Sequence, residues 1–233
     1  MAKTFLEPEE VELLENAAPT IRDQLLIRLL FHLGCRVSEC LGIAVEEVDF
    51  TNGLVRIEHF KTRLQIGCPK CNTRLGRKHT FCPACGEKVE AVVTHAREHR
   101  RMRLLPLDRD TADLLAQYAH EGGPVERAGK KMLFGISRHR AWQIVRECAA
   151  RTGLGPLVNP ETGKTHGVSP HRLRDAFAVL AMKTDDSGEG MRLLQEHLGH
   201  ASFNTTARYR KVSGDEHRDW YQRLWQKEPR NKT

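Results

Sequence analysis

Four cysteines in two closely spaced pairs place the tightest constraint on how this chain folds. The pairs are Cys68-Pro-Lys-Cys71 and Cys82-Pro-Ala-Cys85, with 10 residues between them. Each C-x-x-C knuckle can direct two thiolates at one metal ion, and two knuckles complete the four-sulfur tetrahedron that zinc prefers in closed, structural sites. We therefore predict a structural Zn²⁺ bound by Cys68, Cys71, Cys82 and Cys85. A redox pair or an iron site is the alternative.

The remaining composition indicates a globular intracellular protein. The chain has 233 residues and an odd count of seven cysteines, and it begins without an apolar signal segment, so a secreted disulfide scaffold is disfavoured. Cys35, Cys40 and Cys148 lie in apolar helical surroundings and are predicted to be core residues. The sequence has no run of about 18 apolar residues, and we expect no membrane partner.

Positive charge is concentrated after an acidic opening segment. The balance of Lys and Arg against Asp and Glu is −6 over residues 1–60, +7 over 61–110 and +6 over 111–233. An uneven basic excess favours a polyanionic partner, most commonly nucleic acid, although a solvated basic surface has the same composition.

Hydrophobic spacing changes from helical to alternating and back along the chain. Helices are predicted from Pro8, over 21–33, 37–43, 111–120, 137–152, 170–183 and 190–198, and at the end of the chain. Strands are predicted at 54–57, 92–94 and 102–107, with a turn at 49–53 and a loop at 153–168. This order predicts an α+β, mainly helical fold with a small antiparallel sheet.

Four short segments carry cationic side chains and a phenol. They are Gly34-Cys-Arg36-Val-Ser-Glu39, Ser169-Pro-His171-Arg-Leu-Arg174, Leu198-Gly-His200, and Thr205-Thr-Ala-Arg-Tyr209. Such side chains suit chemistry at a phosphodiester, because guanidinium groups bind non-bridging phosphate oxygens with two parallel hydrogen bonds and stay charged at any working pH.

In this order and spacing, the segments resemble those of the tyrosine recombinase (phage integrase) family, which includes lambda-type integrases and Xer recombinases. The family also has a lysine on a β-hairpin, and Lys61 occupies the matching position. The resemblance implies a tyrosine-recombinase-like catalytic domain, double-stranded DNA as the partner, and a cytoplasmic, nucleoid-associated location. It implies a site-specific recombinase of the integrase, excisionase or resolvase type, acting through a 3′-phosphotyrosine intermediate.

The resemblance also assigns catalytic roles. Arg36 and Arg174 would bind the phosphate, His200 would donate a hydrogen bond to it, and Tyr209 would attack phosphorus. His171 would accept the tyrosine proton, and Lys61 would protonate the leaving oxygen. Rejoining would need no ATP and no catalytic metal, since the phosphotyrosine link keeps the energy of the broken bond.

Each of these residues also has an ordinary structural interpretation. Arg36 can pair with Glu39, His200 can cap a helix, Tyr209 can be a half-buried core residue, and Lys61 can be a solvated strand residue. Arg100, Arg101 or Lys88 can also replace Lys61 as the proton donor. Two rival functions remain, a non-catalytic zinc-ribbon DNA-binding protein and a type IB topoisomerase.

Two departures from the family concern the organisation of the chain. The ribbon of residues 62–97 is predicted to be inserted in the hairpin of a catalytic domain formed by 1–61 and 98–233. Basic residues of the ribbon either contact DNA or another subunit, or are simply solvated. The first catalytic arginine falls at residue 36, which leaves no room for the family's N-terminal DNA-gripping domain, so we expect either a catalytic fragment or reliance on a separate core-binding protein.

The last helix is predicted to carry an apolar stripe of Trp220, Tyr221, Leu224 and Trp225. In the family, this segment docks on a neighbouring protomer, often in a tetramer on DNA. Packing on its own domain is the alternative.

Two further motifs are rejected. His95-Ala-Arg-Glu-His99 fits a metallopeptidase pattern that requires a helix, but it lies between strand-like residues. Gly163-Lys-Thr165 lacks the earlier glycine of a phosphate-binding loop, because Val158 stands there.

Overall fold

The computed structural model describes residues 3–76, 79–89, 93–159, 162–200, 202–207 and 209. The side chains of 59–66 and 93–101 are outside this description. The chain forms two compact units, one made of Met1–Ile57 with Arg103–Thr233 and the other of Glu58–Met102. These limits differ from the predicted ribbon boundaries at 62 and 97, and the ribbon as a domain of its own stays a prediction.

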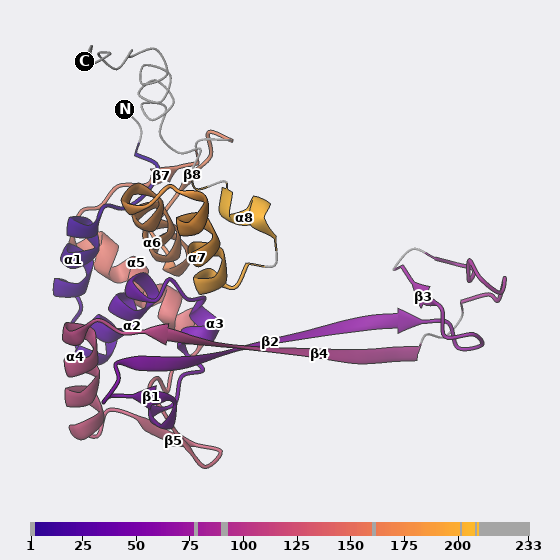
Figure 1. Ribbon diagram of the computed structural model, residues 1–233, viewed down its shortest axis with the longest axis horizontal. Coiled ribbons are helices and arrows are strands. Elements are labelled where there is room, and N and C mark those ends of the chain that lie inside the picture. The colour runs from indigo at the N-terminus through magenta and orange to yellow at the C-terminus, as the bar shows by residue number, and fades with distance from the viewer. Residues whose placement is uncertain are drawn as a thin grey trace, which may run out of the picture. The chain divides into compact units, whose positions relative to one another are not determined.

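The first unit is built around helix α2 (Ile21–His32), most of whose residues are buried. Figure 1 shows it among the other helices. Its residues Leu26, Leu29 and Leu30 have no exposed surface. The Thr20 side chain caps the helix by accepting a hydrogen bond from the Asp23 N–H. Five helices pack on α2: α1 (Pro8–Asn16), α3 (Val37–Cys40), α4 (Arg109–His120), α5 (Arg138–Arg151) and α6 (Pro170–Thr184).

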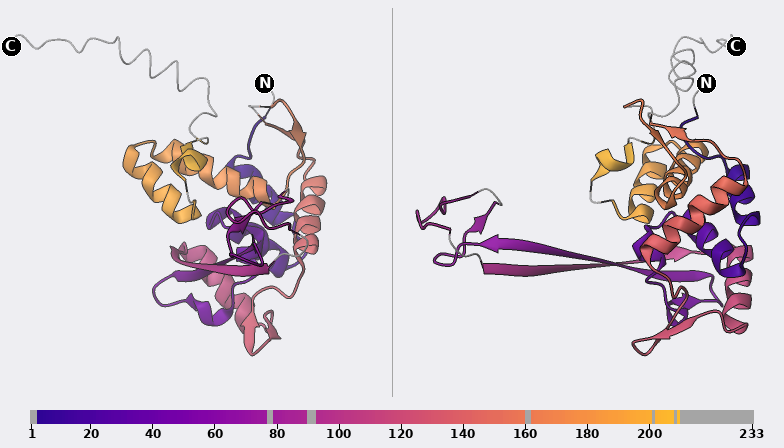
Figure 2. Two further views of the ribbon diagram at one scale, coloured as in Figure 1. Left: turned by 90° about the vertical axis from the view of Figure 1, so that its right-hand side faces the viewer. Right: turned by 180° about the vertical axis from the view of Figure 1, so that it is seen from behind.

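Helices α6, α7 (Gly188–Leu198) and α8 (Phe203–Ala207) follow one another and pack in sequence, as Figure 2 shows. Proline at the first position of α6 is tolerated because that residue needs no N–H donor within the helix. Gly199 ends α7 in the left-handed region, with φ of 64°. These elements bring the segments around Arg174, His200 and Tyr209 into one part of the unit.

The strands are antiparallel wherever their register is described. After the short helix η1 (Val45–Glu47), β1 (Val48–Asp49) pairs with β2 (Leu54–Gly67) across the predicted turn, where Gly53 has a φ of 62°. Strand β2 also pairs with β3 (Arg74–Leu75) and with β4 (Val93–Pro106). Two small hairpins complete the set, β5 (Val125–Arg127) with β6 (Lys130–Met132) and β7 (Leu157–Val158) with β8 (Thr165–His166).

The predicted fold class is confirmed, since the chain is mainly helical with small antiparallel sheets. The structure corrects details. Residues 93–106 form one continuous strand where two short ones were predicted, so His95 and His99 lie on β4 and not on the helix that a metallopeptidase motif needs. The predicted loop 153–168 contains β7 and β8, and α8 was not predicted. The predicted C-terminal helix with its apolar stripe lies outside the described residues.

Among the described residues, none of the helices has the length and apolar character needed to cross a bilayer.

Gly34 at the end of α2 generates a stability prediction. Its φ is 53°, and a Cβ atom there would lie 2.4 Å from Phe177 Cδ1 on α6. We expect Gly34→Ala to lower the free energy of unfolding by about 2 kcal/mol or more, from backbone strain plus overpacking. Gly155→Ala is the matched control, since nothing lies within 4 Å of its added Cβ. Urea titrations of both variants check this, and equal midpoints would contradict it.

Candidate active site

Arg174 lies at the centre of the candidate site. It projects from α6 and is 2% exposed. Its Nη1 donates to the Gly34 carbonyl oxygen at 2.6 Å, and its Nη2 donates to the Leu198 carbonyl oxygen at 2.8 Å. The guanidinium therefore joins the end of α2 to the end of α7, which are remote in sequence. These two hydrogen bonds fix the plane of the fork.

The buried carboxylate of Glu39, on α3, interacts with three nearby arginines. Its Oε1 accepts from Arg36 Nη1 at 2.8 Å, and its Oε2 accepts from Arg103 Nη2 at 2.9 Å. Arg174 Nη1 lies 4.0 Å from the same Oε2. Burial opposes ionisation of Glu39, but the charges of Arg103 and Arg36 and the hydrogen bonds from Arg36 outweigh it, so its pKa is lowered.

The pKa of Arg174 is lowered to about 10, first by burial and then by the positive charge of Arg36. The side chain stays protonated at neutral pH. Arg36 and Arg174 lie 2.8 Å and 4.0 Å from the two oxygens of Glu39, so two guanidinium groups flank one small volume, an arrangement suited to binding an anion.

His200 connects Arg174 to Tyr209. His200 Nε2 lies 3.0 Å from Arg174 Nη2, and its Nδ1 lies 2.9 Å from the Thr206 hydroxyl on α8. The His200 and Tyr209 rings are stacked with centroids 6.3 Å apart and an interplanar angle of 15°. Three of the six predicted catalytic residues are thus in one connected group.

Tyr209 is 6% exposed, and its hydroxyl donates to Asp175 Oδ1 at 2.9 Å. Asp175 also accepts from Arg172 Nη1 at 3.0 Å, and His171 Nε2 lies 3.8 Å from the same Oδ1. The phenol therefore has a carboxylate partner, and the imidazole predicted to accept its proton lies beside that carboxylate. The His171 side chain is 62% exposed.

The other two predicted catalytic residues are placed differently. Arg36 makes the ion pair with Glu39 that its structural interpretation required, and it also lies close enough to Arg174 to lower that residue's pKa. The backbone of Lys61 lies in β2, but its side chain is outside the described residues. The substitutes Arg100 and Arg101 share that limit, whereas Lys88 belongs to the cysteine-containing unit.

Sequence reasoning did not assign a role at the site to Glu39, Arg103 or Asp175. Asp175 follows His171 by one helical turn, so the spacing placed both on one face of α6. Glu39 follows Arg36 by three residues and accepts a hydrogen bond from its backbone N–H at 2.9 Å, which is a capping arrangement visible in the sequence. Arg103 had no comparable signal, because its contact with Glu39 spans 64 residues.

Arg103 also explains one glycine of the Leu-Gly-His segment. A Cβ atom on Gly199 would lie 2.2 Å from Arg103 Nη1. The guanidinium therefore occupies the space where any other residue at 199 would carry its side chain. Arg103 Nε is buried and is the side-chain atom for which no hydrogen-bond partner is found within the described residues.

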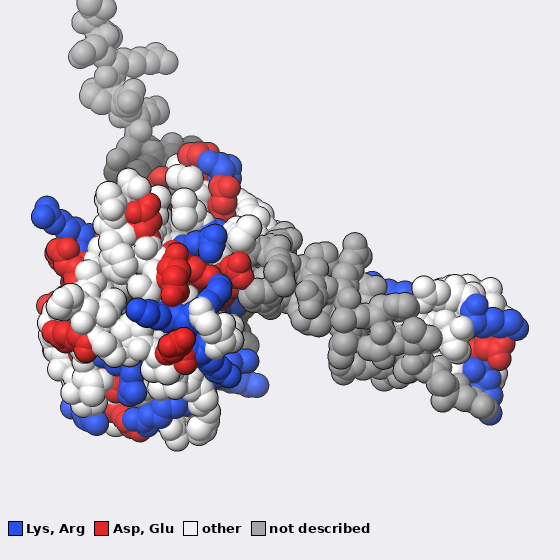
Figure 3. Space-filling model, turned by 90° about the horizontal axis from the view of Figure 1, so that it is seen from below, with Lys and Arg blue, Asp and Glu red and all other residues white. Residues whose placement is uncertain are grey.

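Charges on the surface of this unit are mixed. On the face drawn in Figure 3, Lys and Arg side chains alternate with Asp and Glu and do not separate into patches of one sign. Although the chain has a net charge of +7, the Lys and Arg side chains seen on that face do not form a continuous basic surface.

The four predicted metal-binding cysteines lie together in the second unit. Their Sγ atoms are all within 4.8 Å of one another, with Cys68–Cys85 at 3.6 Å and Cys71–Cys82 at 3.5 Å. Tetrahedral zinc with Zn–S bonds of about 2.3 Å requires S–S separations of about 3.8 Å. The donor set and its spacing therefore fit a zinc ion.

The knuckle turns have matching backbone geometry. The residue after each second cysteine is left-handed, with φ of 57° at Asn72 and 72° at Gly86. The Asn72 N–H donates to the Cys68 carbonyl, and the Gly86 N–H donates to the Cys82 carbonyl. The basic residue Lys70 pairs with Glu87 at 2.9 Å.

Comparisons with known proteins agree with this geometry. Residues 4–80 match the phage integrase family. The chain is 30% identical over 201 residues to the tyrosine recombinase XerD of Neisseria meningitidis serogroup B, covering 83% of this chain and 51% of that protein. It is 29% identical over 224 residues to XerD of Corynebacterium glutamicum, covering 92% and 59%. The chain thus spans little more than half the length of these relatives.

Solved structures show the same fold at low identity. A XerA recombinase superposes with a TM-score of 0.62 and 18% identity, over 98% of this chain and 67% of that chain. The Tn1549 transposon integrase in complex with transposon right end DNA gives a TM-score of 0.62 and 15% identity, over 96% and 67%.

The Glu39 network generates a second prediction. Glu39→Gln should lower the free energy of unfolding by about 3 kcal/mol or more, because it leaves buried guanidinium groups without their anion. Since its folded pKa is below the ordinary 4.5, the ionised carboxylate contributes its full stability above that pH and loses it as the pH falls through the folded value.

The measurement is a set of denaturant titrations between neutral and acidic pH. Wild type should lose stability over this range more steeply than the Gln variant. Glu147→Gln is the control, because its surface pair with Arg140 is worth about 0.5 kcal/mol. Parallel pH profiles for wild type and Glu39→Gln would overturn the assignment.

Proposed function

Because the chain belongs to the phage integrase family of tyrosine recombinases, we propose that it is a site-specific DNA recombinase that cleaves and rejoins strands through a 3′-phosphotyrosine intermediate. Integration, excision and resolution are the reactions of this type. One observation carries the proposal: the connected group in which His200 lies 3.0 Å from Arg174 and stacks on Tyr209. A phenol, an imidazole and a guanidinium from three different segments thus form one chain of contacts.

The cations stabilise charge on phosphorus. A phosphodiester repels nucleophiles, and its five-coordinate transition state concentrates more negative charge on the non-bridging oxygens. Arg36 and Arg174 bind these oxygens, His200 adds a hydrogen bond, and the N-terminal N–H groups of α6 add a positive dipole end. Glu39 holds Arg36 and Arg103 without neutralising the site, since one carboxylate faces three guanidinium groups.

Tyr209 attacks phosphorus after losing its proton. A free phenol has a pKa of about 10, so an acceptor is needed. His171 takes this role in our proposal, and Asp175 holds the hydroxyl until then, because it accepts the Tyr209 hydrogen bond and lies 3.8 Å from His171. Lys61 protonates the departing 5′ oxygen. The phosphotyrosine keeps the energy of the broken bond, so ATP and a catalytic metal are not part of the proposal.

Double-stranded DNA is the proposed substrate, in a tetramer joined by the segment after Tyr209. A separate core-binding domain or protein would supply additional grip on the DNA, and the enzyme would act at the nucleoid in the cytoplasm. Relaxation of supercoils by a type IB topoisomerase and DNA binding without catalysis are less favoured, because the relatives are named as recombinases.

Zinc is the proposed structural ion of the cysteine cluster, held by the thiolates of Cys68, Cys71, Cys82 and Cys85. When bound, it supplies a cross-link within a unit whose described side chains form a buried cluster of Cys68, Leu75 and Cys82. We propose that this inserted ribbon holds the hairpin that carries Lys61.

Covalent linkage to DNA tests the function. A nicked duplex incubated with wild type should give a denaturation-resistant protein–DNA adduct, and Tyr209→Phe should give none because the nucleophile is lost. Tyr118→Phe is the matched control, since this other buried tyrosine donates to backbone carbonyls of Gly123 and Leu133 and lies outside the site. Adduct formation by Tyr209→Phe, or its absence from wild type on every duplex tried, would end the proposal.

Metal analysis tests the zinc proposal. The purified chain should contain one zinc per molecule, and Cys71→Ser should lose it, whereas Cys148→Ser in the core should retain it. Removing zinc with a chelator should also reduce cleavage of the nicked duplex at least tenfold if the ribbon positions Lys61. Full cleavage by the zinc-free chain would separate the ribbon from catalysis.

A further inference from the structure

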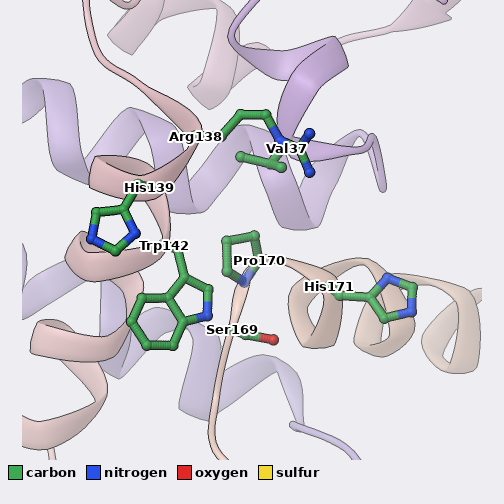
Figure 4. Close-up of a pocket in the computed structure, with 7 residues that line it drawn as sticks. All are labelled: Val37, Arg138, His139, Trp142, Ser169, Pro170 and His171. Atoms are coloured by element: carbon green, nitrogen blue, oxygen red, sulfur yellow. The ribbon is translucent and has the colours of Figure 1, made fainter.

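A cavity of about 420 Å³ opens beside the proposed catalytic group, and all of its lining residues belong to the first unit. Three elements form it: the start of α3, the first turns of α5 and the start of α6 (Figure 4). Its lining combines aromatic, cationic and small side chains: Val37, Arg138, His139, Trp142, Ser169, Pro170 and His171.

Trp142 is the main apolar surface in this cavity. It is 45% exposed, although the unit has a large core that could bury an indole. The ring stacks on His139 with centroids 6.2 Å apart and an interplanar angle of 18°, and the Arg146 guanidinium lies 5.5 Å from its centroid. These neighbours hold the indole in place while nearly half of the residue stays open to solvent.

Polar groups suited to an anion surround the indole. Arg138 and Val37 line one part of the cavity. Ser169 and Pro170, at the start of α6, line another part (Figure 4). The Ser169 side chain makes no capping hydrogen bond to α6. The Ser169 and Arg138 side chains therefore line the same space as the aromatic ring, at the positively polarised start of this 15-residue helix.

The cavity is continuous with the residues proposed to bind the cleaved phosphate. Val37 directly follows Arg36, and His171 lines the cavity while lying 3.8 Å from Asp175, the partner of Tyr209. A strand whose phosphate lies between Arg36 and Arg174 would bring a neighbouring nucleotide toward the Val37 side of this cavity. An aromatic face with cations beside it matches a nucleotide, whose base stacks on the ring while its phosphate pairs with the cations.

We propose that this cavity binds one nucleotide of the DNA strand next to the cleaved phosphodiester, with its base turned out of the duplex and stacked on Trp142 and its phosphate facing Arg138 and the start of α6. The proposal rests on DNA being the substrate, as argued above. Stacking of bases on an aromatic ring tolerates any sequence, so the cavity would position the strand at the cleavage point without reading it.

The test measures equilibrium binding without cleavage. All proteins carry Tyr209→Phe, and the probe is a labelled duplex selected from a randomised pool by its binding to that protein. Trp142→Ala should weaken binding about tenfold or more, from the loss of one stacked base. Trp142→Phe should restore most of the affinity. Trp142→Leu, which keeps apolar volume without an aromatic face, should be as weak as the alanine variant.

Two arginines on α5 provide a second test, in which Arg138 lines the cavity and Arg140 is the matched control. Arg138→Ala should weaken binding. It should also reduce the slope of log K against log salt concentration by about one, the value for a single phosphate contact. Arg140→Ala, whose side chain is paired with Glu147 at 2.8 Å and does not line the cavity, should leave both unchanged.

Abasic substitution then locates the nucleotide. One position beside the cleavage point should weaken wild-type binding when its base is removed and should have no further effect in Trp142→Ala. The proposal fails if Trp142→Ala and Arg140→Ala bind alike, or if no abasic position shows this dependence. It also fails if Trp142→Ala alters only the size of the assembly in light scattering, because the cavity would then hold a neighbouring copy. These binding measurements do not require the protein–DNA adduct. A failed cleavage assay would therefore contradict the proposed recombinase function without deciding whether the cavity binds a nucleotide.

Discussion

The ionised Glu39 carboxylate is the interaction on which the arrangement of cations depends. Arg36 and Arg103 donate to its two oxygens, and Arg174 lies 4.0 Å from one of them. Guanidinium groups in so small a volume repel one another, and after burial the positive charge of Arg36 is the next cause that lowers the pKa of Arg174, to about 10. A single buried anion holds them together while leaving excess positive charge. That excess is what a phosphate group can use, because a neutral pairing would have no attraction left for it.

Much of this site followed from local sequence patterns, because its parts are short segments with fixed internal geometry. The helix starts at Pro8, Ile21 and Pro170 were all predicted from caps and spacing, and the four cysteines lie as close together as their knuckles required. The contacts of Arg103 with Glu39 and Gly199 depend instead on how a strand and two helix ends pack. No local pattern encodes such a contact. The partner of the Tyr209 hydroxyl was missed because Asp175 lies 34 residues away.

Tyr209 and Arg174 differ in how the fold constrains them. Arg174 is tied to the carbonyl oxygens of Gly34 and Leu198, which belong to the ends of long helices packed in the core. Tyr209 follows the five-residue helix α8, and its hydroxyl has one described hydrogen bond, to a side chain. The cationic half of the site is therefore built into the core. In the proposed reaction, the phenol would exchange its hydrogen bond with Asp175 for a bond to phosphorus.

Gly199 shows that a residue of a short motif can be required because it has no side chain, and not because it supplies a chemical group. Its φ of 64° ends α7, and the room left by its absent side chain is filled by a guanidinium from β4. The Leu-Gly-His segment and Arg103 are therefore complementary in shape, although Gly199 and Arg103 are 96 residues apart along the chain. A larger residue at 199 would therefore strain the left-handed backbone and displace the Arg103 guanidinium, which donates a hydrogen bond to Glu39.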